Sequence, residues 1–160
     1  MEVGPTCIIN EHAVLRATAV GDEERSVVVG DHVLVGPHAS LLGCTVEPCS
    51  YVATGATVLQ GATVRSGANV AVGAVVHANA VVPREFFVPP NTVAVGDPLR
   101  VFAPGDEGLV EAIKAAGFAA SAFGVRIPFE DRINRYRAST EVRSREFGVH
   151  SGDTVLDPER

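Results

Sequence analysis

The chain has 160 residues, a length that fits one domain. Hydrophobic residues make up 46% of it but aromatic residues only 6%, so small aliphatic side chains are expected to fill the core. The net charge of −6 argues against a general nucleic-acid-binding protein, which usually carries a basic patch. The sequence shows no signal peptide and no uncharged apolar run of about 20 residues, so we expect no membrane partner and a cytoplasmic location. Cys7, Cys44 and Cys49 form no CxxC pattern and fit reduced thiols.

An aliphatic residue recurs at six-residue steps through the first part of the chain. The series is Val3, Ile9, Leu15, Val29, Val35, Leu41, Val46, Val52, Val58, Val64, Val70, Val76, Val82 and Val88. It is interrupted between residues 15 and 29 and shortened by one residue between 41 and 46. The residue four positions after each aliphatic one is small almost every time. This period fits neither an amphipathic helix nor an alternating strand. It predicts a solenoid of short parallel strands, with the aliphatic residue inside and the small residue at a corner.

This hexapeptide-repeat pattern resembles that of left-handed β-helix proteins over residues 3 to about 101. The predicted fold is an all-β solenoid, a left-handed parallel β-helix over residues 1–101 with a loop insertion at 17–28. The resemblance implies a homotrimer with sites between subunits. The repeat begins at once at Val3, whereas relatives start with further coils. We therefore expect the first coil to need a cover, either a helix or a partner, because an open strand edge invites association.

Two helices are predicted after the repeat, in a helical segment over residues 102–148. Asp106 is expected to cap the first helix and Gly117 to end it. The second is expected from about Phe129 to Phe147. The face expected to dock on the solenoid or on a neighbouring subunit contains Ile133, Tyr136 and Thr140. A flexible tail is predicted for residues 149–160.

Within this superfamily the chain resembles the gamma-class carbonic anhydrases. The likeness is carried by "INEHAVLR" (9–16), "VGDHVLVGPHASLLGCTV" (29–46) and "VATGATVLQGATV" (52–64), and that family also shortens a repeat at the stretch "LLGCT". Its members bind zinc through three histidines, which fall here on Arg16, Pro37 and Leu42. Arginine stays protonated, and proline and leucine carry no donor atom. A classical zinc site, which needs such a cage, is therefore not expected. We predict no cofactor, with zinc or coenzyme A (CoA) as less favoured alternatives.

The repeat register predicts which residues border this position. His12 and His38 are each the fourth residue of a hexad, so they are expected to stack one coil apart, about 4.8 Å along the axis. Glu11 is expected beside Pro37, and Arg16 beside Leu42.

Three interpretations of this cluster stay open. In one, these residues are ordinary solvated corner residues. In another they form a rebuilt site, in which Asn10, Arg16 and Tyr51 bind a small anionic molecule and Glu11, His12 and His38 transfer protons. In the last, His12 and His38 belong to a relocated metal site.

Several functions therefore remain open, and the sequence leaves undecided whether the chain is an enzyme. The leading one is an anhydrase-like protein without the three-histidine zinc site, which binds or transforms a small anionic molecule at the trimer interface. The alternatives are a hexapeptide acyl-CoA transferase, favoured by the fold and the "VGDPLRV" ending, an assembly or scaffold protein, and a zinc lyase with relocated ligands. Acyltransferases of this fold use a histidine base. His77 is a weak candidate for it, because no long substrate loop is evident nearby.

Overall fold

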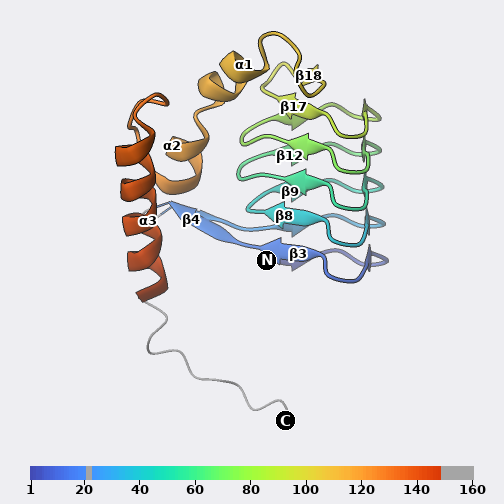
Figure 1. The fold of residues 1–160 in the computed structure, drawn as a ribbon. Coiled ribbons are helices and arrows are strands. Elements are labelled where there is room, and N and C mark those ends of the chain that lie inside the picture. The colour runs from blue at the N-terminus through green and yellow to red at the C-terminus, as the bar shows by residue number, and fades with distance from the viewer. Residues whose placement is uncertain (21–22, 149–160) are drawn as a thin grey trace.

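The computed structural model describes residues 1–20 and 23–148 and is a left-handed parallel β-helix followed by three helices (Figure 1). Three parallel sheets form the sides of the solenoid. The first stacks β1 (Glu2–Val3), β6 (Val28–Val29), β9 (Thr45–Val46), β12 (Thr63–Val64) and β15 (Val81–Val82). The second stacks β2 (Ile8–Ile9), β7 (Leu34–Val35), β10 (Tyr51–Val52), β13 (Asn69–Val70) and β16 (Phe87–Val88). The third stacks β3 (Val14–Arg16), β8 (Ser40–Leu42), β11 (Thr57–Val58), β14 (Val75–Val76), β17 (Val93–Val95) and β18 (Arg100–Phe102).

The recurring aliphatic residues meet along the solenoid axis. Val52 lies opposite Val35 on one side and Val70 on the other, and all three are fully buried. Alanines fill the tight corners beside them and are equally buried, as at Ala56 and Ala74. The predicted β-helix is therefore confirmed, with its core made of stacked small side chains.

Each corner requires a left-handed backbone conformation at the fourth residue of its hexad. Glycine supplies it at Gly55, Gly61, Gly67 and Gly73, while His12, His32, His38, Asn79 and Asn91 adopt the same positive φ elsewhere. Asparagine and histidine are among the non-glycine residues that tolerate this conformation best. His12, His32 and His38 therefore lie at corners where the backbone requires a positive φ.

The insertion at 17–28, predicted as a loop, contains an antiparallel hairpin. Its strands are β4 (Thr18–Val20) and β5 (Glu23–Arg25), with Thr18 opposite Arg25. The hairpin leaves the solenoid at the corner between the third and first sheets, and it projects toward the C-terminal helices (Figure 1).

The chain reverses at the C-terminal end of the solenoid, where β18 pairs antiparallel with β17. Three helices follow, α1 (Leu109–Ala116), α2 (Phe118–Phe123) and α3 (Arg132–Gly148). Gly117 ends α1 in a left-handed conformation, as predicted. The predicted cap at Asp106 is wrong: Gly108 is the N-cap residue, and the Asp106 carboxylate accepts a hydrogen bond from the Ala103 amide. Helix α2 was not predicted.

Helix α3 runs along the side of the solenoid, with α2 between them (Figure 1). The predicted docking face does not contact the chain's own solenoid, since Ile133 is 74% exposed and Tyr136 58% exposed. The neighbouring flank of the helix faces the chain instead: Ser139 is buried, and the Arg143 guanidinium lies 4.9 Å from the centre of the Phe123 ring. No described helix is long and apolar enough to cross a bilayer.

The first coil has no cover within residues 1–20 and 23–148. Its inward residues Val3 and Ile9 are 44% and 41% exposed, whereas Val29 and Val35, one coil above them, are almost fully buried. The tail predicted for 149–160 lies outside the described residues.

Candidate functional site

The predicted pairing of His12 with His38 is confirmed. Their rings stack with centroids 4.9 Å apart and planes 14° apart, at the corner between β2 or β7 and the next strand. The amide of His38 donates a hydrogen bond to the Glu11 carbonyl, which fixes the two corners in register. Both side chains are exposed. The pair is therefore a surface feature of the solenoid corner.

The other residues of the predicted cluster are spread around this corner. Asn10 uses its side-chain amide to donate a 2.7 Å hydrogen bond to the Val35 carbonyl, a structural contact. Glu11 is exposed beside the histidines, and Arg16 lies opposite Leu42 at the far end of β3. Tyr51 lies on β10, in the second sheet, above Leu34. The structure brings His12 and His38 together but places Arg16 and Tyr51 on other strands.

The positions that hold zinc in gamma-class anhydrases do not suit a metal ion here. Pro37 and Leu42 are half-buried and carry no donor atom. Among residues 1–20 and 23–148, no group of three or more His, Cys, Asp or Glu side chains is arranged to hold an ion. The stacked rings of His12 and His38 lie face to face, whereas shared metal ligands must point at a common centre.

A second histidine site lies on the third sheet. His77 follows Val76, whose register partners are Val58 and, one coil further, Leu41. His77 therefore lies in the same outward-facing column as Leu42 and Arg16. Its side chain is only 6% exposed, because Phe118 covers it with an edge-on ring contact at 5.9 Å between centroids.

Burial changes the chemistry of this imidazole. Removal from water lowers the pKa of His77 below its usual value, since burial disfavours the charged ring. Its Nδ1 atom is buried and has no hydrogen-bond partner in the described part of the chain. A buried polar atom without a partner is costly and often marks a functional position. His77 is thus a buried imidazole whose charged form is disfavoured and whose Nδ1 atom lacks a partner in the described residues.

The C-terminal segment lines a partly open cavity of about 380 Å³ beside His77. Its walls come from the end of α1, the start of α2, the segment after α2 and the first turn of α3. Apolar groups dominate the lining, including Ile113, Phe118, Val125, Ile127 and Phe129. Lys114, Arg126 and Arg135 supply positive charge at the same cavity. The arrangement combines a neutral base, apolar walls and cationic groups, as small-ligand sites commonly do.

The three cationic side chains differ in their partners. Lys114 forms a 3.0 Å ion pair with Glu130, and this hydrogen bond is the largest cause that lowers the pKa of the Glu130 carboxyl. Neither Arg126 nor Arg135 forms an ion pair within residues 1–20 and 23–148. The Nε atom of Arg135 is buried and has no hydrogen-bond partner there. The cavity therefore retains positive charge that the described residues do not neutralise.

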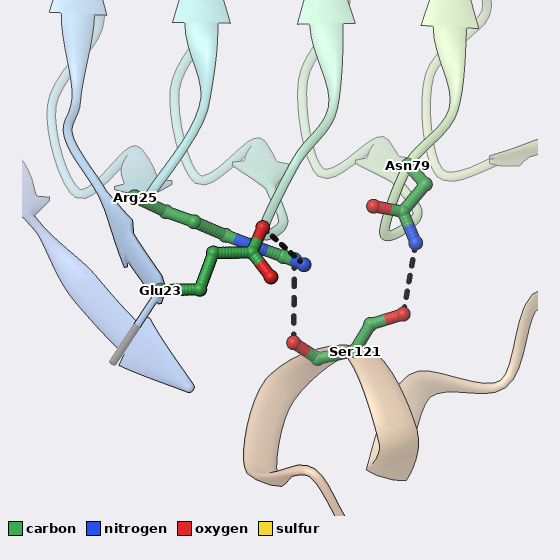
Figure 2. Close-up of polar contacts among 4 residues, drawn as sticks. All are labelled: Glu23, Arg25, Asn79 and Ser121. Carbon is green, nitrogen blue, oxygen red and sulfur yellow. Dashed lines mark hydrogen bonds and ion pairs between the residues drawn. The ribbon is translucent and has the colours of Figure 1, made fainter. Parts of the chain in front are cut away.

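A polar cluster holds α2 against the solenoid (Figure 2). Arg25, from the inserted hairpin, donates a 3.2 Å hydrogen bond to the Ser121 carbonyl and pairs with Glu23 at 3.4 Å. Asn79, at a solenoid corner, donates a 2.8 Å hydrogen bond to the Ser121 hydroxyl. The hairpin and the corner thus fix the helix that carries Phe118 over His77.

Cys44 is a packed thiol, as the sequence indicated. It is 2% exposed, and burial raises its pKa to about 12, so it has no thiolate character at neutral pH.

The sequence made His77 a weak candidate because no long substrate loop is evident near it. The cover is instead built from helices more than thirty residues further along. One signal was available: His77 is second in its hexad, a position that points outward, and an aromatic and cationic helical segment follows the repeat.

Comparisons with known proteins do not assign the chain to a family. No family model matches the chain, and no curated protein matches it. One similar solved structure is a Bacillus cereus protein provisionally described as an acetyltransferase, with 14% identity and a TM-score of 0.29, over 95% of this chain and 93% of that one. Another is a variant of GDP-perosamine N-acetyltransferase from Caulobacter crescentus, in complex with CoA and GDP-perosamine. It has 21% identity and a TM-score of 0.29, over 65% of this chain and 57% of that one. Similarity at this level does not transfer an activity.

Proposed function

We propose that this hexapeptide-repeat protein is an acyltransferase whose site is the cavity beside His77. The observation that carries the proposal is the neutral, buried imidazole with an unpaired Nδ1 atom at the wall of a cavity rich in positive charge. A general base works best when it is unprotonated at the working pH, and a lowered pKa provides this state. As in the function predicted from the sequence, the ligand is a small anionic molecule, but its site is the cavity beside His77 and not the cluster around Arg16.

The chemistry assigns His77 the role of base in acyl transfer. An acceptor amine or hydroxyl attacks the carbonyl carbon of an acyl thioester while the imidazole takes its proton. The new bond from the acceptor to carbon forms, the carbon–sulfur bond breaks, and the proton passes on to the departing thiolate. Lys114 and Arg126 would attract the phosphates of an acyl-CoA donor toward the cavity. The apolar walls would hold the acyl group and limit hydrolysis.

A steady-state assay tests this function. Thiol release from acetyl-CoA is followed with a panel of small amines and alcohols. We expect His77→Gln to lower kcat by about a hundredfold or more, the usual contribution of a general base. His32→Gln, the same change at an exposed corner histidine outside both candidate sites, serves as the matched control and should leave the rate unchanged. An unchanged rate in His77→Gln, or no thiol release with any acceptor, would contradict the proposal.

The relation to gamma-class carbonic anhydrases remains a prediction from the sequence. If the chain descends from that group, the replacements at Arg16, Pro37 and Leu42 removed the zinc site. The proposed activity then depends on His77 and not on a metal ion.

The rebuilt anion site around Arg16, Glu11 and His38 is a second candidate, favoured by the confirmed histidine stack. Retained activity in Arg16→Ala would exclude it.

A further inference from the structure

We infer that the cavity selects an acyl acceptor that is a small organic acid with an apolar body, and that Arg135 binds its carboxylate. The inference rests on the proposed function, because it names the second substrate of that site. Its basis is the position of one arginine at the cavity wall and the chemistry of the surfaces around it.

Arg135 is held in place by aromatic rings. Its guanidinium carbon lies 4.7 Å from the centre of the Phe129 ring and 5.5 Å from that of Tyr136. The backbone is anchored as well, since the Ser139 hydroxyl donates a 2.8 Å hydrogen bond to the Arg135 carbonyl. Stacking of this kind orients the planar guanidinium and reduces the entropy lost when a ligand binds.

This oriented group lacks an acidic partner. Arg135 forms no ion pair with any described carboxylate, and its buried Nε atom donates no hydrogen bond within that part of the chain. Glu130 feels the charge of Arg135 only weakly, because Lys114 is its hydrogen-bonded partner. A carboxylate bound to the guanidinium at the cavity wall would supply the acidic partner that Arg135 lacks.

The surrounding walls favour a carboxylate over a phosphate. Phe118, Ile127 and Phe129 line the cavity with carbon atoms, and burying charge against such walls is expensive. A phosphate monoester carries a charge of about −1.5 to −2 at pH 7, whereas a carboxylate carries one and matches the guanidinium fork with two oxygens. The same walls suit an apolar body attached to the acid.

His77 lies at the same cavity, so an acceptor bound through its carboxylate would bring an amine or hydroxyl to the imidazole. The acceptor nitrogen or oxygen would form its bond to the acyl carbon, the thioester carbon–sulfur bond would break, and His77 would pass the acceptor's proton to the sulfur. Arg135 is then a binding group for the acceptor and takes no part in proton transfer.

Equilibrium binding by isothermal titration calorimetry tests the inference with three probes that share a phenyl ring. Benzoate carries the carboxylate, benzamide is its uncharged counterpart, and phenyl phosphate carries the alternative anion. We expect benzoate to bind more tightly than either of the others. Equal affinity for benzamide, tighter binding of phenyl phosphate, or no binding of benzoate would overturn the inference.

Matched variants locate the effect. Arg135→Gln should weaken benzoate binding by about tenfold or more, as expected for a lost hydrogen bond to a charged group. Arg135→Lys, which keeps the charge without the fork, should weaken it less. Arg137→Gln is the control, because Arg137 is an exposed residue of the same helix outside the cavity lining. Unchanged affinity in Arg135→Gln would overturn the assignment, and circular dichroism spectra establish that each variant is folded.

The acid-binding site and the acyltransferase function can be refuted independently of each other. If the protein releases thiol from acetyl-CoA but does not bind benzoate, the result would support the proposed function and refute the acid acceptor. Benzoate binding through Arg135 with no thiol release would refute the transferase and leave an acid-binding site.

Discussion

A histidine in this chain has a chemistry that depends on its place in the hexad. His12, His32 and His38 occupy the fourth position, where the corner needs a positive φ, and all three are exposed. His77 occupies the second position and points away from the axis, where Phe118 buries it. The sequence identified the histidine stack from spacing alone, because residues of equal register must lie one coil apart. It could not identify the burial of His77, because the residues that cover it lie in a different structural element.

The buried imidazole of His77 predicts a pH dependence of stability. Its pKa is lowered in the folded state, so the unfolded chain binds the proton first as the pH falls below about 6.5. The stabilisation is complete above that pH and is lost as the pH falls through the folded pKa, with a slope of at most about 1.4 kcal/mol per pH unit for one proton. Urea unfolding between pH 8 and pH 5 measures it. His77→Gln should flatten the dependence and His38→Gln should preserve it, and equal curves for both variants would show that His77 does not contribute.

The strands and the helices differ in how well the sequence predicts them. The hexads specify strands and corners because each valine packs on its equivalent residues in the coils above and below. The short helix α2, with the sequence FAASAF, is only six residues long and shows no helical period, so no pattern revealed it. Helix α3 contacts its own chain through other residues than the predicted face, whose docking on a neighbouring subunit stays a prediction. It docks through polar residues such as Ser139 and Arg143, whereas the apolar Ile133 stays exposed.

The contact between α2 and the solenoid predicts the effect of one corner substitution. Asn79→Gly keeps the left-handed corner conformation but removes the hydrogen bond to Ser121, so we expect a loss of about 0.5–1 kcal/mol in unfolding free energy. The amides of α2 should also exchange faster with solvent. Asn91→Gly is the control, since Asn91 adopts the same positive φ at a corner that makes no hydrogen bond to α2. Equal effects of the two substitutions would mean that the contact does not hold the helix.

Residues 1–20 and 23–148 form a solenoid that carries helices along one side (Figure 1). The sequence predicted the solenoid. The cavity was not predictable, because it joins His77 to residues between 113 and 135, which meet only when the hairpin and a corner hold α2. The homotrimer remains a prediction. Ile8, Leu34 and Phe87 on the second sheet are exposed apolar residues that such an assembly would cover.

The central claim is that the functional site is the cavity beside His77 and not the corner beside Arg16. Hydrogen exchange measured by mass spectrometry, with and without acetyl-CoA, tests it most directly, because it reports where on the chain a ligand acts. We predict slower exchange in peptides that cover residues 76–80 and 113–129, with no change at 9–16 or 37–42. Protection confined to 9–16 and 37–42, or the absence of any protection, would contradict the account.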